Sequence, residues 1–349
     1  MNRWAVILAG GVGSRFWPLS TPRRPKQLLP LITDSPLLAD TVARLSALVP
    51  VDRTLIVTNA SLVAAVRALL PQLPPENVMA EPRSAGTAPA LAWAATTIAR
   101  RGSADDVMLC VHADWAIGND AEFRATLARA ATVAERERSL VTVGIVPARP
   151  DPGFGYIEPG DHVGNGTTEA ARRVARFAEK PNRETAARMV AEGYLWNSGI
   201  FVWRAGDFLA EVRARTPEVG PFLELAESGD IDAFFSRVTP VSVDEGVLER
   251  SQSVLVIPGD FGCDDVGTWA ALHRVRKRDA SGNAIFGDVH AVEASNNVVH
   301  AEAGSVVLYG VSDLVVVAQD GLTLVTTKER AAELKRLLDA LPSTVRERS

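Results

Sequence analysis

Two cations that follow a glycine-rich turn near the start of the chain could bind phosphate. An apolar run at residues 4–8 leads to Gly10 and Gly11, as a buried strand does where it meets its loop. Glycines leave space for backbone N–H groups to approach an anion or the edge of a base. Beyond the turn, Arg15 offers a planar fork for phosphate oxygens, and Lys26 offers a compact charge. This pattern indicates polyphosphate binding; the alternative is a structural turn beside solvated surface charges.

The spacing of the turn excludes two familiar phosphate-binding motifs. A dinucleotide-binding fingerprint needs a third glycine where Phe16 stands, and a P-loop needs lysine and then serine or threonine directly after its last glycine. What remains is a glycine turn followed by two cations, Arg15 and Lys26, which suits a polyphosphate. A family resemblance described below implies that these two cations are catalytic and that the backbone of Leu8, Ala9, Gly10, Gly11, Gly13 and Ser14 binds a nucleotide.

A carboxylate follows a second buried strand. Asp114 is the first acid beyond the apolar run at residues 107–111. A magnesium ion bound to a triphosphate needs hard oxygen ligands, and usually takes one or two carboxylates, with phosphate oxygens and water completing its shell. Asp114 is therefore a candidate metal ligand, and a role in a turn or helix cap is the alternative.

Apolar runs alternate with helical patterns through the first half of the chain. This alternation predicts an α/β fold with a Rossmann-like, mostly parallel sheet that helices cover on both faces. Ligands bind beyond the carboxyl ends of the strands in such a sheet, which is where we expect the turn and Asp114. Helices are predicted at residues 37–49, 61–70, 87–101, 205–215, 231–237 and 269–276, and strands at 54–57, near Val78, and at 107–111, 140–146 and 254–257.

Composition narrows the class of protein. At 349 residues and 47% apolar content, the chain can bury a large core. A net charge of −5 argues against a nucleic-acid partner, and no apolar run approaches the roughly 20 residues that a membrane span needs. The two cysteines, Cys110 and Cys263, are too few for a disulfide framework, and we expect both to be reduced. These features favour a cytoplasmic enzyme with no membrane partner.

The segment LAGGVGSRFWPLSTPRRPKQLLPL (residues 8–31) closely resembles the signature of the sugar-phosphate nucleotidyltransferases. Within it, FWPLS and PKQLLPL resemble the mannose-1-phosphate guanylyltransferase branch. The resemblance implies a nucleotidyltransferase (GT-A-like) fold and transfer of GMP from GTP to α-D-mannose 1-phosphate, by Mg²⁺-assisted direct in-line displacement. Two alternatives stay open: the same reaction with another NTP or sugar 1-phosphate, and a non-catalytic nucleotide-sugar sensor or regulatory subunit.

The resemblance also implies metal and base contacts. DVGTW at residues 265–269 resembles the family segment with the second metal carboxylate, so Asp265 joins Asp114 as a predicted Mg²⁺ ligand; whether Asp264 shares this role stays open. EP at residues 81–82 and the following TAPA imply that Glu81, Pro82 and Thr87 bind the nucleotide. A carboxylate can accept from both guanine donors, N1 and N2, so Glu81 is the predicted base reader. Here the family's Arg and Asn are replaced by Ala85 and Gly86.

Three later segments resemble the family's sugar-binding set: GFGYIEPG at 153–160, FAEKP at 177–181 and WNSGIFVW at 196–203. Sugar hydroxyls need carboxylate and amide partners, and the 1-phosphate needs a cation. The predicted sugar-phosphate ligands are therefore Gly155, Tyr156, Glu179, Lys180 and Asn197.

Short β segments with glycine and asparagine turns replace helices after residue 280. They resemble the short left-handed β-helix-like domain of the family, which implies packing or dimer contacts. We predict a catalytic domain at residues 1–279, a β-helix-like domain with a terminal helix (residues 328–341) at 280–349, and a homodimer.

Overall fold

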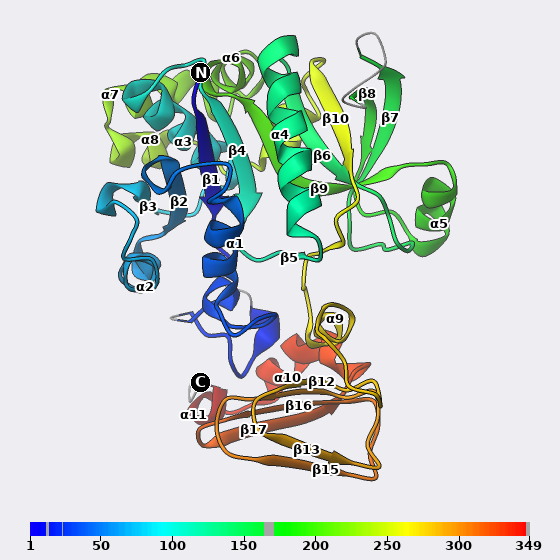
Figure 1. The fold of residues 1–349 in the computed structure, drawn as a ribbon. Helices are drawn as coiled ribbons and strands as arrows, with labels where there is room; N and C mark the ends of the chain where they lie inside the picture. Colours follow the sequence, from blue (N-terminus) through cyan, green and yellow to red (C-terminus); the bar gives the residue numbers. More distant parts are fainter. Residues whose placement is uncertain (12–13, 23, 164–170, 347–349) are drawn as a thin grey trace. The chain divides into compact units, whose positions relative to one another are not determined.

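The computed structural model describes residues 1–11, 14–22, 24–163 and 171–346 (Figure 1). The chain forms two compact units that do not follow its linear order. The first comprises Met1–Gly10, Val42–His112 and Asn119–Gly262, and the second comprises Gly11–Thr41, Ala113–Gly118 and Cys263–Ser349. We predicted two domains that follow one another along the chain, at residues 1–279 and 280–349, and this domain division stays a prediction.

The first unit is built on a nine-stranded sheet with the order β3-β2-β1-β4-β9-β6-β10-β8-β7. Its first four strands are parallel, which puts their carboxyl ends at one edge. Strand β9 runs antiparallel between β4 and β6, so the second half of the sheet is mixed. The strands are β1 (Arg3–Leu8), β2 (Thr54–Asn59), β3 (Val78–Glu81), β4 (Val107–His112), β6 (Leu140–Ile145), β7 (Tyr156–His162), β8 (Arg172–Ala178), β9 (Leu195–Arg204) and β10 (Val254–Gly259). The predicted α/β class is confirmed.

Helices cover both faces of this sheet (Figure 1). On one face, α3, α6, α7 and α8 share a core with apolar residues of β1, β2 and β4, including Val6, Leu55 and Cys110. On the other face, α4 contacts β4, β6, β9 and β10. The helices are α1 (Leu37–Leu45), α2 (Val63–Leu69), α3 (Thr87–Arg101), α4 (Asp120–Glu137), α5 (Arg183–Ala191), α6 (Ala205–Arg215), α7 (Leu223–Ser228) and α8 (Ile231–Arg237). In the part of the chain that the structure describes, no helix combines the length and apolar character of a membrane span.

The second unit is a coil of short strands. Strands β12, β14 and β16 stack in parallel, as do β13 and β15, and β17 closes the coil antiparallel to β16. This arrangement confirms the predicted β-helix-like domain. The elements are β5 (Ala116–Ile117), β11 (Cys263–Asp264), α9 (Trp269–Val275), β12 (Ala284–Phe286), β13 (Val289–Val292), β14 (Val298–Ala301), β15 (Val306–Tyr309), β16 (Leu314–Gln319), β17 (Leu322–Thr327), α10 (Leu334–Ala340) and α11 (Ser343–Arg346).

The segment that follows the glycine turn packs into the core of the second unit. Phe16 and Leu29 share a buried cluster with Trp269 of α9, Val298 of β14 and Leu334 of α10. The Phe16 and Trp269 rings meet edge to face, with centroids 5.1 Å apart. The residues that we predict to bind phosphate are therefore supported by the C-terminal elements. The predicted terminal helix begins at Leu334 instead of residue 328, because a turn and the 3₁₀ helix Arg330–Glu333 come first.

Candidate active site

The strand before the glycine turn is anchored to its neighbour. The Ala9 N–H donates to the carbonyl of Val57, the Thr58 hydroxyl to the carbonyl of Ala9, and the Asn59 amide to the carbonyl of Gly10, at 2.8, 2.9 and 2.8 Å. Leu8 ends β1 one residue earlier. The turn therefore starts from a fixed point at the carboxyl edge. Gly11 is exposed, Gly13 lies outside the described residues, and Ser14 starts a 3₁₀ turn.

Glu81 lies at the same edge of the first unit. It is the last residue of β3, and its Oε2 atom is 3.4 Å from the position that a Cβ on Gly10 would take. Burial raises the pKa of Glu81 to about 7. A buried carboxyl group beside a glycine backbone is suited to accept hydrogen bonds from the N–H groups of a base. The position of Glu81 is therefore consistent with its predicted role in binding guanine.

The loop after Glu81 is bonded to the last turn of α8 and to the residue that follows this helix. The Arg83 guanidinium donates to the carbonyls of Phe235 and Val238, at 2.7 and 2.6 Å. Gly86 has φ +86°, and a Cβ there would lie 2.3 Å from the Val241 carbonyl oxygen, so the family's larger residue cannot fit this backbone. Pro82 belongs to this loop.

Thr87 starts α3, and its hydroxyl accepts from the N–H of Val243 at 2.8 Å. Gly86 takes the N-cap position, so the Thr87 side chain fastens the loop to residues 241–243. Its nucleotide-binding role stays a prediction.

The three predicted sugar-binding segments meet within the first unit. The Asn197 N–H donates to the Gly155 carbonyl at 2.8 Å, and a Cβ on Gly155 would lie 3.3 Å from Glu179 Oε2. Lys180 and Glu179 form an ion pair of 2.7 Å with both side chains 65% exposed, so both are available to a ligand. Lys180 also has a positive φ of 33°, which is uncommon for a residue other than glycine.

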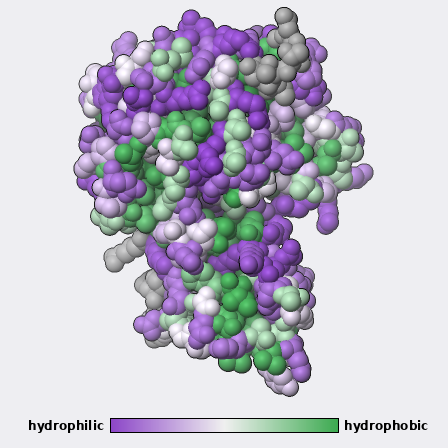
Figure 2. Space-filling view, in the orientation of Figure 1, coloured by the Kyte–Doolittle hydropathy of each residue, from purple (hydrophilic) through white to green (hydrophobic). Residues whose placement is uncertain are grey.

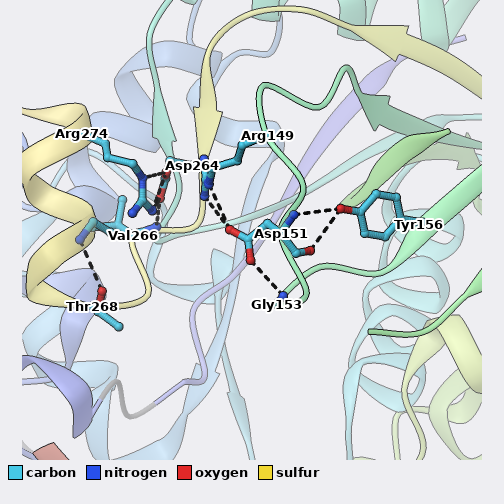
Figure 3. Close-up of polar contacts among 9 residues, drawn as sticks. Arg149, Asp151, Gly153, Tyr156, Asp264, Val266, Thr268 and Arg274 are labelled. Carbon is cyan, nitrogen blue, oxygen red and sulfur yellow. Dashed lines mark hydrogen bonds and ion pairs between the residues drawn. The ribbon is translucent and has the colours of Figure 1, made fainter. Parts of the chain in front are cut away.

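Tyr156 differs from these residues because its hydroxyl is already paired. It donates to the Asp151 carbonyl at 3.1 Å and accepts from the Asp151 N–H at 3.0 Å (Figure 3). The Asp151 carboxylate in turn binds Arg149 and the Gly153 N–H, which fixes the loop before Gly155. The predicted contact of Tyr156 with sugar stays a prediction.

Asp244 was missed in the sequence analysis. It starts a π-helical turn, Asp244–Leu248, and its Oδ1 accepts from the Asn197 amide at 2.7 Å. Burial raises the pKa of Asp244, while Asn197 and His112 oppose that shift. Asp244 lies between α8 and β10, outside every predicted strand and every segment that resembles the family, so no signal in the sequence pointed to it.

Lys26 links the two predicted metal ligands in the second unit. Its Nζ atom lies 3.0 Å from Asp114 Oδ2 and 2.5 Å from the backbone oxygen of Asp265. The Lys26 side chain is only 7% exposed, whereas that of Asp114 is 38% exposed. Burial raises the pKa of the Asp265 carboxyl, as do the negative charges of Asp264 and Asp114, and Lys26 opposes them. Excess negative charge at this place favours a cation.

The adjacent acids Asp264 and Asp265 have different surroundings. Asp264 accepts from the Val266 N–H at 3.0 Å and from Arg274 at 3.0 and 3.2 Å, so its carboxylate is largely satisfied (Figure 3). Val266 is fully buried with φ +46°, a strained conformation for a β-branched residue. Burial and the bond to Asp264 hold Val266 in this conformation, and the turn leads to the helix N-cap, where Thr268 accepts from the N–H of Ala271.

Arg15 lies near this turn. Its Nη1 atom is 3.3 Å from the position that a Cβ on Gly267 would take, and the residue is exposed. A side chain on Gly267 would therefore crowd Arg15. Within the second unit, the structure brings Arg15, Lys26, Asp114 and the Asp265 turn together.

The donor set at Lys26 fits a hard divalent cation. In the described ranges, no group of three or more His, Cys, Asp or Glu residues is arranged to hold a metal ion alone. Asp114 and Asp265 supply two carboxylates, and Mg²⁺ usually takes one or two from protein and completes its shell with phosphate and water. The elevated pKa of Asp265 has the sign expected where a cation is to be bound.

Comparison with known proteins agrees with this geometry. Residues 4–282 match the nucleotidyl transferase family model, and residues 287–341 match that of the mannose-phosphate isomerase/GMP-like β-helix domain. A mannose-1-phosphate guanylyltransferase, ManC of Salmonella typhimurium, is 38% identical over 97% of this chain and 73% of its own length; one from Escherichia coli K12 has the same identity and coverage.

A Thermus thermophilus crystal structure, described as a mannose-1-phosphate geranyltransferase, superposes with a TM-score of 0.88 at 32% identity. The match covers 97% of this chain and 99% of that one. The chain therefore belongs to the nucleotidyl transferase family, in its mannose-1-phosphate guanylyltransferase group.

Proposed function

We propose that this enzyme transfers GMP from GTP to α-D-mannose 1-phosphate, giving GDP-mannose and pyrophosphate. The identity to mannose-1-phosphate guanylyltransferases over 97% of the chain supports these substrates. The observation that carries the proposal is the meeting of Gly155, Glu179 and Asn197, because it brings three separate sugar-binding segments to one place.

The reaction needs no side-chain nucleophile. An oxygen of the sugar phosphate attacks the α-phosphorus of GTP, the bond from that phosphorus to the bridging oxygen breaks, and pyrophosphate leaves in line. The sugar phosphate is already anionic at neutral pH, so no general base is required. The obstacle is repulsion between anions, and catalysis rests on positioning and charge neutralisation.

The cations of the second unit are assigned to the phosphates. Arg15 covers the leaving β- and γ-phosphates, and Lys26 draws the sugar phosphate into line together with Lys180. Asp114 and Asp265 would hold Mg²⁺, which when bound supplies further charge neutralisation for the phosphates. Lys26 is held beside both acids, at 3.0 Å from Asp114 Oδ2 and 2.5 Å from the backbone oxygen of Asp265, which supports this assignment.

The residues of the first unit are assigned to recognition. The backbone of Leu8 to Gly10 approaches the nucleotide, and Glu81 accepts from the guanine N1 and N2 donors. Glu179 and Asn197 accept and donate hydrogen bonds to mannose hydroxyls. Gly155 permits close approach, because a side chain there would meet Glu179.

The test is pyrophosphate release by the purified chain with each of the four NTPs, paired with mannose 1-phosphate or glucose 1-phosphate. Assays with Mg²⁺ and with EDTA report the metal requirement. Release mainly with GTP and mannose 1-phosphate is expected. Release with another pair would keep the mechanism and change the substrate, and silence with all pairs despite nucleotide binding would contradict catalysis.

We further propose a cytoplasmic homodimer. The chain has only two cysteines, Cys110 and Cys263, which are too few for the disulfide framework of a secreted protein. Val292, Val307 and Tyr309 of β13 and β15 are 52%, 67% and 69% exposed, and apolar side chains are visible on this unit in Figure 2. A second copy of the chain would cover them. Light scattering of the wild type and of Tyr309→Arg tests this: a dimer that the substitution dissociates is expected, and a wild-type monomer would refute it.

A further inference from the structure

A row of polar and charged side chains joins the β-helix-like coil to the loop that carries Lys26. The Arg24 guanidinium binds Glu302 through two bonds, Nη1 to Oε2 and Nη2 to Oε1, both at 2.7 Å. Arg24 lies two residues before Lys26 and pairs with Thr21 through two backbone hydrogen bonds of 3.1 Å. Its position is therefore fixed from the coil.

The other end of the same loop is held by Arg276. Its Nε donates to the Leu31 carbonyl at 2.6 Å, and its Nη2 donates to His300 Nδ1 at 2.7 Å. Arg276 is 7% exposed, and burial lowers its pKa to about 10. Arg24 and Arg276 thus hold the segment between residues 24 and 31, which contains the 3₁₀ turn Lys26–Leu28, at both ends.

His300 connects the two ends. It is fully buried, stacks on Phe286 with centroids 4.3 Å apart, and meets Trp269 edge to face. Arginine only donates, so His300 Nδ1 is the acceptor and the proton lies on Nε2. That atom lies 3.6 Å from Glu302 Oε1, too far for a direct hydrogen bond, and Glu302 binds Arg24. Arg276, His300, Glu302 and Arg24 therefore lie in one row, in which His300 and Glu302 are neighbours without a hydrogen bond.

Burying polar side chains in this row costs free energy of desolvation, so we expect the row to do more than stabilise the fold. Arg276 and His300 are buried and lose hydration, and well-packed apolar residues would often stabilise a fold as well or better. Buried ionic groups can instead fix one geometry among several. Here that geometry is the position of Lys26, whose Nζ contacts Asp114 and the backbone oxygen of Asp265 from this turn.

We propose that the row from Arg276 through His300 and Glu302 to Arg24 is a brace that fixes the Lys26 loop for phosphate binding. Glu302 and Arg276 are then positioning residues for nucleotidyl transfer, although neither touches substrate. The proposal rests on the proposed function, because it assumes that Lys26 binds phosphate.

The first experiment compares Arg24→Gln, Glu302→Gln and the double variant in the pyrophosphate assay. Each single variant is expected to lower kcat about tenfold, because small misplacement of a catalytic group lowers the rate while leaving most binding contacts intact. KM for GTP should change less than about twofold. The kcat of the double variant should be no lower than that of either single variant, because all three variants break the same two hydrogen bonds between Arg24 and Glu302. Additive losses, or wild-type kcat in Glu302→Gln, would overturn the brace.

The control is Glu227→Gln, which breaks an ion pair with Arg213 in the first unit. The two pairs have comparable exposure, 42% and 21% for Arg24 and Glu302 against 47% and 37% for Arg213 and Glu227. Unchanged kcat is expected for this variant. An equal loss would show that any such substitution lowers activity, and would overturn the assignment.

Amide hydrogen exchange tests the brace independently of activity. The N–H groups of Leu28 and Leu29 bond to the carbonyls of Pro25 and Lys26, at 2.9 and 3.0 Å, and report the order of the loop. Glu302→Gln should speed their exchange, while Glu227→Gln should not. If the wild type released no pyrophosphate with any substrate pair, the proposed function would fail, but faster exchange would still support the brace. Unchanged exchange would refute the brace even in an active enzyme.

Discussion

The ammonium of Lys26 lies 3.0 Å from Asp114 Oδ2, and both groups belong to the unit that also contains the β-helix-like coil. The same ammonium reaches the backbone oxygen of Asp265 at 2.5 Å. One buried lysine thus holds two acidic segments that are far apart in the sequence. Its charge offsets part of theirs before any ligand binds, and a phosphate that binds here meets a cation already fixed in place.

Substitution of Lys26 tests this arrangement. Lys26→Met keeps the length of the side chain and removes its charge, so kcat/KM in the pyrophosphate assay should fall about 10²-fold. Lys328→Met is the matched control, because Lys328 also pairs with an aspartate, Asp313 at 3.1 Å, and is 19% exposed. The control should retain activity. Near-normal turnover in Lys26→Met would remove the lysine from the mechanism.

The adjacent acids Asp264 and Asp265 should respond differently to the loss of a negative charge. Asp265→Asn should abolish turnover without lowering Tm in EDTA, because burial and its neighbours raise the pKa of Asp265 and disfavour its charge. Asp264→Asn weakens the bonds with Arg274 and should cost about 1 kcal/mol of stability. Calorimetry and Mg²⁺-dependent turnover measure both effects. Full activity in Asp265→Asn would contradict the metal assignment.

The parallel half of the sheet was predictable because its elements are local and regular. The strand at residues 107–111 and the helices at 87–101, 205–215 and 231–237 occur where their apolar periodicity placed them. The helix α4 was not predicted, although Asn119 caps its N-terminus and its buried residues Phe123, Leu127, Ala130 and Ala134 recur with helical spacing. The place of β9 inside the sheet depends on long-range pairing with β4 and β6, which no local pattern reports.

The residue types of the candidate site could be predicted from the sequence, but the hydrogen bonds between distant residues could not. The motifs that contain Arg15, Lys26 and Asp265 are local, so they could be recognised one at a time. The bond between Asp244 and Asn197 joins residues 47 positions apart, and the bond between Arg24 and Glu302 joins residues 278 apart. Such partners depend on how the elements fold together, and spacing along the chain carries no record of them.

The pKa of Glu81 predicts a pH-dependent affinity for guanine nucleotides. Burial raises it from 4.5 to about 7, and an ionised carboxylate is needed to accept from guanine. Since ionisation goes from about a tenth to about nine tenths between pH 6 and 8, Kd for GTP should fall roughly tenfold over that range. Titration calorimetry with GTP measures this pH dependence of Kd in the wild type and in Glu81→Gln. The comparison isolates Glu81, because the ionisation of GTP itself affects both proteins equally. An identical pH dependence in the two would refute the base reader.

The raised pKa of Glu81 also makes the stability of the folded chain depend on pH, in the opposite direction to its affinity for GTP. Because the folded-state pKa of Glu81 is raised, its favourable contribution is complete below pH 4.5 and is lost as the pH rises through about 7. In the ligand-free chain, Glu81→Gln should therefore raise Tm more at pH 8 than at pH 5. The exposed acid Glu76 supplies the control Glu76→Gln, for which no such difference is expected. Equal changes in Tm at both pH values would contradict the burial of this charge.

Loss of the Asp244 charge should weaken binding of mannose 1-phosphate and leave binding of GTP unchanged. The Asp244 carboxylate accepts from the Asn197 amide at 2.7 Å, which fixes how Asn197 faces Gly155 and Glu179. Asp244→Asn can present an amide to that amide and release Asn197, so KM for mannose 1-phosphate should rise about tenfold, with KM for GTP unchanged within about twofold. The exposed neighbour Glu245 provides the matched control, Glu245→Gln, with both KM values expected to be those of the wild type. A rise in both KM values for Asp244→Asn would indicate general damage to the first unit, whereas no rise would show that Asn197 keeps its place without Asp244.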